Sequence, residues 1–155
     1  DLHKAIRRQR QMCIRDSDET IYTDVDFSRI AHIQYEQDYQ ALRTANKVCF
    51  FDTDATYTDY FSELYMGHSN ELVEKYIDPD RYDLLIYLTP DVRWVPDGQR
   101  LNGDEDRRRM LNDRLWDMYV AHGFKDKMVV VSGDYSQRLA HAIRLVDELL
   151  GGSQP

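Results

Sequence analysis

The sequence predicts an α/β fold in which a small parallel sheet is flanked by helices. Three short apolar runs, at residues 47–52, 82–88 and 128–131, have the length and composition of buried strands. Segments with apolar residues at helical spacing separate these runs and follow the last one. Such alternation favours parallel strands that are joined by right-handed helical crossovers. A length of 155 residues is typical of one domain.

A helix is predicted from Asp26 to about Asn46, directly before the first strand. Asp26 can cap the start of this helix, and Asn46 can end it. Its apolar residues recur near helical spacing and are Phe27, Ile30, Ala31, Ile33, Ala41, Leu42 and Ala45. The strand at 47–52 then reads Lys-Val-Cys-Phe-Phe-Asp.

Two helices and a turn are predicted between the first and second strands. Residues 56–65 have helical character, and Gly67 can end that helix in the left-handed conformation. Residues 70–76 predict a second, shorter helix. The sequence Asp-Pro-Asp at 78–80 marks a turn before the strand at 82–88.

The second half of the chain predicts a loop, a helix, a strand and a final helix. Residues 89–105 are polar and include four Pro or Gly residues, so we expect a mobile loop. A helix at 106–122, ended by Gly123, would turn inward Leu111, Leu115, Met118 and Tyr119. After the strand at 128–131, a helix at 135–150 has on one face Leu139, Ile143, Val146 and Leu150.

The composition excludes several classes of protein. The formal net charge of −8 disfavours nucleic acid as a partner, because phosphate binding needs a basic surface. No apolar run approaches the roughly 20 residues of a membrane span, and no signal peptide is visible. The two cysteines, Cys13 and Cys49, make neither a disulfide framework nor a metal motif. We therefore expect a soluble cytoplasmic protein.

Residues 1–17 differ from the rest of the chain. They carry five basic and two acidic residues, a net charge of +3, and their apolar residues form no sustained face. The string Met-Cys-Ile-Arg-Asp-Ser at 12–17 resembles a translated sequencing adapter. Two interpretations stay open: a non-native segment, or a disordered basic tail.

Asp52 and Asp54 follow the first predicted strand. In α/β proteins the carboxyl end of a strand is where ligands bind. One of the two carboxylates could hold Mg²⁺ through water, or accept a proton or a hydroxyl hydrogen bond from a substrate. The alternative is that the Asp-x-Asp sequence only caps the following helix. Both interpretations stay open from the sequence.

The loop at 94–100, Trp-Val-Pro-Asp-Gly-Gln-Arg, has the most varied set of binding groups. Trp94 can stack on an aromatic ring, Asp97 can accept hydroxyl hydrogen bonds, and Arg100 can reach a phosphate. Gly98 permits a reversal of the backbone.

Three consecutive arginines stand near the start of the next helix. Positive charge opposes the helix dipole there, so we expect Arg107 to contact an anion. For Arg108 and Arg109 we favour a solvated charged face that acidic neighbours balance. These neighbours are Asp104, Glu105 and Asp106.

The turn Ser-Gly-Asp-Tyr at 132–135 lies between a strand and the last helix. Ser132, Asp134 and Tyr135 could contact a nucleotide base through backbone groups. The favoured alternative is an ordinary strand–helix turn in which Asp134 is the helix cap. The five histidines show no ligand spacing, so no histidine metal site is predicted.

Several motifs occur in a fixed order. They are Asn-Lys at 46–47, Phe-Asp-Thr-Asp at 51–54, Tyr-Asp-Leu at 82–84, Trp-Val-x-Asp-Gly-x-Arg at 94–100 and Asp-Tyr-x-x-Arg at 134–138. Together they resemble the nicotinamide riboside kinase domain of NadR-type NAD-biosynthesis proteins, over about residues 24–150.

The resemblance implies a three-layer, P-loop kinase-like domain that phosphorylates nicotinamide riboside to nicotinamide mononucleotide with ATP and Mg²⁺. It implies that Asp52 and Asp54 lie at the active-site strand end, with Asp52 near the Mg²⁺ ion. It also implies that the 94–100 residues form a lid or substrate loop, that Arg107 is a lid arginine, and that 132–135 contacts ATP.

The chain departs from this family at the phosphate-binding element. The sequence has no G-x-x-x-x-G-K-[ST] motif, and no glycine precedes Gly67. That loop supplies the backbone N–H groups and the lysine that hold the phosphates. We therefore expect a sheet that lacks its first strand and phosphate loop, with a partial kinase-like domain at 18–151 and a tail at 152–155.

Three hypotheses follow. In the first, the full-length protein is the kinase and this chain is a truncated, inactive part of it. In the second, the chain is a non-catalytic module that binds the nucleoside. In the third, it is an inactive fragment of a P-loop protein that self-associates through an exposed sheet edge.

Overall fold

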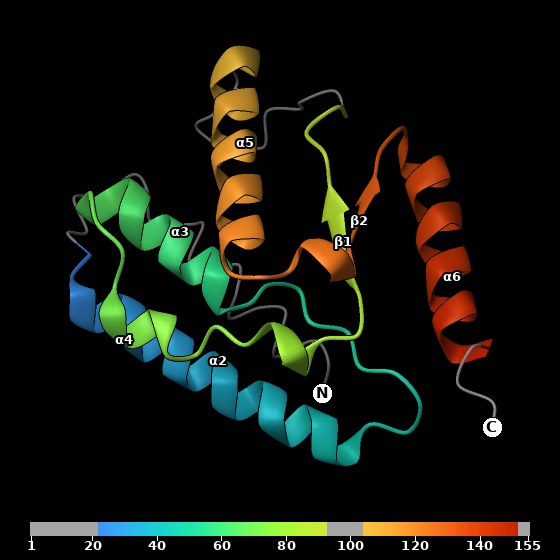
Figure 1. Ribbon diagram of the computed structural model, residues 1–155, viewed down its shortest axis with the longest axis horizontal. Helices are drawn as coiled ribbons and strands as arrows, with labels where there is room; N and C mark the ends of the chain where they lie inside the picture. The colour runs from blue at the N-terminus through green and yellow to red at the C-terminus, as the bar shows by residue number, and fades with distance from the viewer. Residues whose placement is uncertain (1–21, 93–103, 152–155) are drawn as a thin grey trace.

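The computed structural model describes residues 22–92 and 104–151, and within them it has an α/β fold with a small parallel sheet (Figure 1). The helices are α2 (Asp24–Thr44), α3 (Ala55–Met66), α4 (Glu71–Glu74), α5 (Glu105–Ala121) and α6 (Tyr135–Gly151). The strands are β1 (Leu85–Leu88) and β2 (Met128–Val131). Short 3-10 helices occupy Pro79–Arg81 and Lys125–Lys127.

The sheet pairs β1 with β2 in parallel. Leu85 is aligned with Met128 and Leu88 with Val131. Two of the three predicted strands are therefore present, and the 128–131 prediction is confirmed at both ends. The strand predicted at 82–88 is shorter, because the three residues before Leu85 do not join the ladder.

The prediction of a strand at 47–52 is wrong for this structure. Residues 47–52 form no strand, and their backbone makes no hydrogen bond with the rest of the described chain. An apolar run becomes a strand only when a neighbouring strand accepts and donates its backbone hydrogen bonds. Phe50 is 71% exposed, whereas the Phe51 ring packs edge-on against Tyr82 at 5.8 Å.

The start of α2 is set by Thr23, not by the predicted Asp26. The side chain of Thr23 accepts a hydrogen bond from the Asp26 amide, and the Asp26 carboxylate accepts one from the Thr23 amide at 2.9 Å. This reciprocal pair is a capping box. The helix ends at Thr44, shortly before the predicted stop.

Polar caps also fix α3 and α4. Asp54 caps the start of α3, and Gly67 ends it with φ +81°, as the glycine predicted. The side chain of Asn70 accepts hydrogen bonds from the Leu72 and Val73 amides, which starts α4.

Two hydrophobic cores hold the elements together. The first core lies among α2, α3 and α4, and its buried residues are Phe27, Ala31, Ala55 and Val73. The second core lies between the sheet and α5, and its buried residues are Tyr87, Tyr119 and Phe124. Ile77, in the segment between α4 and β1, packs against both cores. Figure 1 shows the same division, with α2, α3 and α4 together and α5 and α6 beside the sheet.

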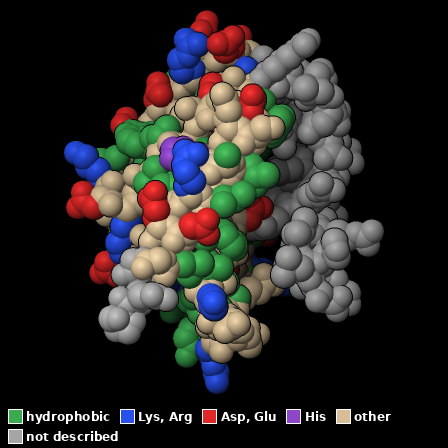
Figure 2. Space-filling view, turned by 90° about the vertical axis from the view of Figure 1, so that its right-hand side faces the viewer, with side chains coloured by type: hydrophobic (Ala, Val, Ile, Leu, Met, Phe, Trp, Pro, Cys, Tyr) green, Lys and Arg blue, Asp and Glu red, His purple; other side chains and the backbone are tan. Residues whose placement is uncertain are grey.

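Helix α6 leaves part of its apolar face in solvent. Leu139 is 63% exposed and Ile143 is 52% exposed, whereas Val146 and Leu150 are half-buried. Figure 2 shows this side of the molecule, where hydrophobic side chains reach the surface among charged ones. No described helix combines the length and the apolar character that crossing a membrane requires.

Candidate functional site

Polar groups from three elements meet where β1 and β2 end. The carboxyl ends of parallel strands lie at the same edge of a sheet, so Thr89, Asp91 and Gly133 come close together. Arg138 of α6 donates from Nε to the Gly133 carbonyl at 2.8 Å and from Nη2 to the Thr89 carbonyl at 2.7 Å. We call Thr89, Asp91, Gly133 and Arg138 the carboxyl-edge cluster.

Asp91 is the acceptor at the centre of this cluster. Its carboxylate accepts hydrogen bonds from the Gly133 amide at 2.7 Å and the Thr89 hydroxyl at 2.7 Å, and it pairs with Arg138. The Gly133 amide in particular lowers the pKa of Asp91 to about 2. Asp91 was not among the predicted site residues, although the strand-end rule that selected Asp52 applies equally to a carboxylate after β1.

The predicted contact at 132–135 borders the carboxyl-edge cluster. Asp134 caps α6, because its carboxylate accepts from the Gln137 amide at 2.9 Å and its own amide donates to the Gln137 side chain at 2.9 Å. This confirms the cap interpretation of Asp134. The Gly133 and Asp134 amides are therefore already used. The exposed groups at this turn include the Ser132 hydroxyl and the Tyr135 ring, which is 75% exposed.

Gly133 has φ +95°, which side chains rarely adopt. A Cβ atom there would lie 2.4 Å from Oε1 of the Gln137 side chain. Both observations explain why glycine occupies this turn.

Asp54 is buried and does not lie in the carboxyl-edge cluster. Its carboxylate accepts from the Tyr57 amide at 3.1 Å, the Thr56 hydroxyl at 3.3 Å and the Tyr119 hydroxyl at 2.9 Å. Burial raises the pKa of Asp54, although these hydrogen bonds act in the opposite direction. The alternative interpretation of Asp54 as a helix cap is confirmed.

Asp52 is exposed and does not join that network. Its neighbour Phe51 contacts Tyr82, which precedes β1, so the 51–54 segment lies toward the amino end of this strand. The structure therefore separates Asp52 and Asp54 from the carboxyl-edge cluster.

The three arginines of α5 differ in their surroundings. Arg107 is exposed at the helix start, where its amide donates to the Asp104 carboxylate at 2.6 Å. Arg109 pairs with Glu105 at 3.0 Å, as expected for a solvated charged face. Arg108 departs from that expectation, because its Nε is buried and makes no hydrogen bond within the described chain. The predicted residues Trp94, Asp97, Gly98 and Arg100 lie outside the described residues.

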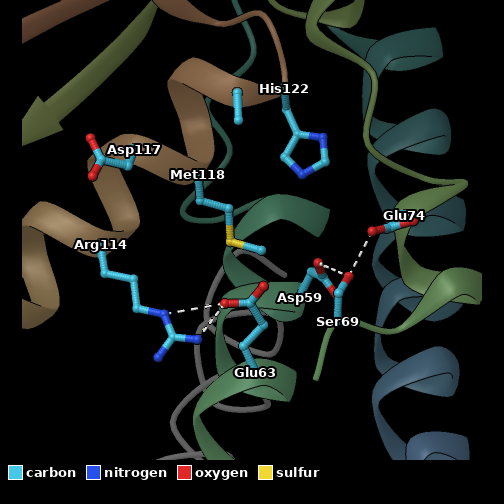
Figure 3. A pocket seen from close by; sticks show the side chains of 9 residues that line it. Asp59, Glu63, Ser69, Glu74, Arg114, Asp117, Met118 and His122 are labelled. Atoms are coloured by element: carbon cyan, nitrogen blue, oxygen red, sulfur yellow. Dashed lines mark hydrogen bonds and ion pairs between the residues drawn. The ribbon is translucent and has the colours of Figure 1, made fainter. Parts of the chain in front are cut away.

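A separate hollow of about 320 Å³ opens between α3, α4 and α5 (Figure 3). Its charged lining consists of Asp59, Glu63, Glu74, Asp117, Arg114 and His122. These residues were not predicted as a site, because they are scattered along the sequence. Across residues 22–92 and 104–151, no three His, Cys, Asp or Glu side chains are arranged to hold a metal ion.

Comparison with known proteins identifies the family to which this chain belongs. Residues 3–138 match the protein family described as AAA domain. The chain belongs to this family. The AAA domain is also similar to the trifunctional NAD biosynthesis/regulator protein NadR of Salmonella typhimurium and to that of Escherichia coli. Each is 35% identical over 130 residues, which cover 84% of this chain and 31% of the relative. The predicted resemblance to NadR-type proteins is thereby confirmed.

The AAA domain thus spans about a third of the length of these relatives. Proteins with a P-loop use nucleotides and Mg²⁺ in general. In this AAA domain, the turn after β2 offers the Ser132 hydroxyl and the Tyr135 ring, and the start of α5 offers the exposed Arg107.

Proposed function

We propose that this AAA domain is part of a kinase that transfers the γ-phosphoryl group of ATP to the 5′-hydroxyl of nicotinamide riboside. The observation that supports this most is the 35% identity to proteins named for NAD biosynthesis, over 84% of the chain. The motifs at 51–54, 94–100 and 134–138 support the same reading.

In this proposal the substrate loop supplies the groups that recognise the riboside. The Trp94 ring stacks on the pyridine ring, Asp97 accepts ribose hydroxyl hydrogen bonds, and Gly98 lets the loop reverse. Arg100 and Arg107 neutralise charge on the transferring phosphoryl group, which is the main task of the protein in such a reaction.

The nucleotide lies against the turn at 132–135 in this proposal. Because the Gly133 and Asp134 amides are already used, the base is held by stacking on Tyr135 and by the Ser132 hydroxyl. Asp134 contributes by fixing the turn. In the complete kinase, the parallel sheet has helices on both faces, so that the domain has three layers.

In the complete kinase, Mg²⁺ would bind near Asp52 and the phosphates, with residues 47–52 paired into the sheet so that Asp52 reaches its carboxyl edge. Asp52 fits this role, because Mg²⁺ keeps several waters and needs only one or two carboxylates from the protein. The exposed Asp52 carboxylate leaves room for such waters. Asp54 fits less well as a ligand, since its oxygens already accept three hydrogen bonds.

The decisive experiment replaces the matching segment of the Escherichia coli NadR protein with residues from this chain. The chimera then combines this domain with whatever phosphate-binding element that protein supplies. We expect it to convert nicotinamide riboside and MgATP to nicotinamide mononucleotide, measured by mass spectrometry. A folded chimera that binds ATP but makes no product would overturn the proposal, with unmodified NadR as the control.

The 155-residue chain is expected to give no product in the same assay, because its sequence contains no phosphate loop. Calorimetry with nicotinamide riboside distinguishes the alternatives for this chain. Binding without turnover would indicate a nucleoside-binding module, and adenosine serves as the control ligand.

A further inference from the structure

Ser69, in the turn between α3 and α4, lies between two carboxyl groups. Its Oγ is 2.7 Å from Oδ2 of Asp59 and 2.7 Å from Oε1 of Glu74. Figure 3 shows these three side chains in line at one wall of the hollow. A serine hydroxyl has a single proton to donate, and ionised carboxylates only accept. With both carboxylates ionised, one of these short contacts would join two acceptors. A further proton is therefore required.

The burial of the two carboxyl groups decides where this proton resides. Asp59 has no exposed surface, whereas Glu74 is exposed. Burial raises the pKa of Asp59, and the negative charges of Glu74 and Glu63 raise it further, against hydrogen bonds from Asn70 and Ser69. Burial therefore favours a proton on Asp59 over one on Glu74, and a protonated Asp59 donates to Ser69 while Ser69 donates to Glu74.

The same carboxyl group also holds the start of α4. Oδ1 of Asp59 accepts from the amide of Asn70 at 2.7 Å, and Asn70 is the cap of α4. Asn70 in turn donates from its side chain to the Asp24 carbonyl of α2 at 2.9 Å. Asp59 thus connects α3 through one oxygen to Ser69 and Glu74, and through the other to the cap of α4.

We propose that Asp59, Ser69 and Glu74 form a pH-sensitive latch, closed by a proton on Asp59, that holds α4 against α3. When Asp59 ionises, two negative charges face each other across one hydroxyl, and the Glu74 contact is lost. Arg114 does not compensate, because it is engaged with Glu63 at 2.6 Å. The other ionisable groups that surround the latch are His68, Asp24, Asp117 and His122.

The first test is a carbon-detected NMR titration of the Asp and Glu carboxyl groups in the folded 155-residue chain. We expect Asp59 to ionise above the ordinary range of aspartate. Glu74→Gln should shift the Asp59 midpoint to lower pH, because Gln can donate to Ser69, whose proton is then free for ionised Asp59. Asp117→Asn, in the same hollow, is the matched control and should leave the midpoint unchanged. An Asp59 midpoint that Glu74→Gln does not move would overturn the latch.

The second test compares unfolding free energies across pH. Because folding raises the Asp59 pKa, the stability from this proton is present at low pH and is lost as pH rises through the folded value. Asp59→Asn should remove this loss of stability with rising pH, since the side-chain amide of asparagine can donate to Ser69 at every pH. A variant that retains the full pH dependence of the parent chain would contradict the proposal.

Discussion

Asp54 shows how one buried carboxylate can serve the fold at a position where the sequence also allows catalysis. Its oxygens accept from an amide of α3 and from the hydroxyls of Thr56 and Tyr119. A carboxylate at a strand end and a carboxylate at a helix start look the same in a sequence. The hydrogen bond from Tyr119, far along the chain, cannot be predicted from the local sequence.

Asp54→Ala is expected to lower the unfolding free energy by about 2–4 kcal/mol. The change removes a helix cap, which is worth about 1 kcal/mol, and leaves a buried hydroxyl without an acceptor, which costs about 1–3 kcal/mol. Urea denaturation followed by circular dichroism measures the loss. Asp52→Ala is the matched control and should change stability by less than about 0.5 kcal/mol. Equal effects of the two substitutions would refute this account of Asp54.

Asp38, on α2, provides a pH-dependent prediction. Burial raises its pKa to about 6, the nearby Asp54 also raises it, and Arg81 lowers it. The folded chain therefore binds the Asp38 proton more tightly than the unfolded chain does. The stability that this proton adds to the folded chain is fully present below about pH 3.8 and is lost as the pH rises to about 6.

Asp38→Asn should therefore be more stable than the parent chain at pH 8, by about 1–2 kcal/mol after allowance for solvent screening of a half-buried group. The difference should vanish at acidic pH, where both chains are uncharged at this position. Urea titrations at several pH values test this. A constant difference between the two chains at every pH would contradict it.

At the scale of elements, the helices were predictable and the first strand was not. Apolar spacing and end signals such as Gly67 are local, so they located α2, α3, α5 and α6 within a few residues. The run at 47–52 has strand composition, but pairing depends on a partner that composition does not reveal. Composition alone therefore could not show that 47–52 would remain unpaired.

The candidate site was predictable in part for the same reason. Asp134 as a cap follows from local sequence, and the structure confirms it. Asp91 and Arg138 meet only because β1 and β2 are neighbours in the sheet. Asp59 was missed because an aspartate inside a helix carries no local sign of burial.

The carboxyl-edge cluster predicts a local change in exchange rates. Arg138→Met removes the donors to the Gly133 and Thr89 carbonyls, each worth about 1 kcal/mol or more. We expect the Gly133 amide to exchange with solvent about tenfold faster, measured by NMR hydrogen exchange. Asp91→Asn keeps an acceptor for that amide and should have the smaller effect. If the Gly133 amide exchanges as slowly in both variants as in the parent chain, the cluster does not hold this turn.

At the scale of the whole molecule, the exposed face of α6 predicts self-association. Leu139 and Ile143 are apolar and in solvent, and exposed apolar groups of this kind favour contacts between molecules. We expect the apparent mass to rise with concentration in analytical ultracentrifugation, and Leu139→Glu to reduce that rise. Ala140→Glu adds the same charge beside it and is the matched control. A chain that stays monomeric at high concentration would rule this out.

The division into two cores has a consequence for how the chain folds. The buried residues of the first core lie between Phe27 and Val73, and those of the second lie between Tyr87 and Phe124, so each core is built from its own stretch of the chain. Two units with different local stability can open separately. Trp116 packs against the second core, so in a Trp94→Phe background its fluorescence reports on that unit alone.

Several contacts join the two units, among them the packing of Ile77, the hydrogen bond from Tyr119 to Asp54, and the ion pair of Arg114 with Glu63. The Tyr119 hydrogen bond is buried, so its loss should weaken the coupling between the two units. Tyr119→Phe should separate the fluorescence transition from the loss of helix seen by circular dichroism. One buried hydroxyl group would then contribute measurably to the cooperativity of the whole domain.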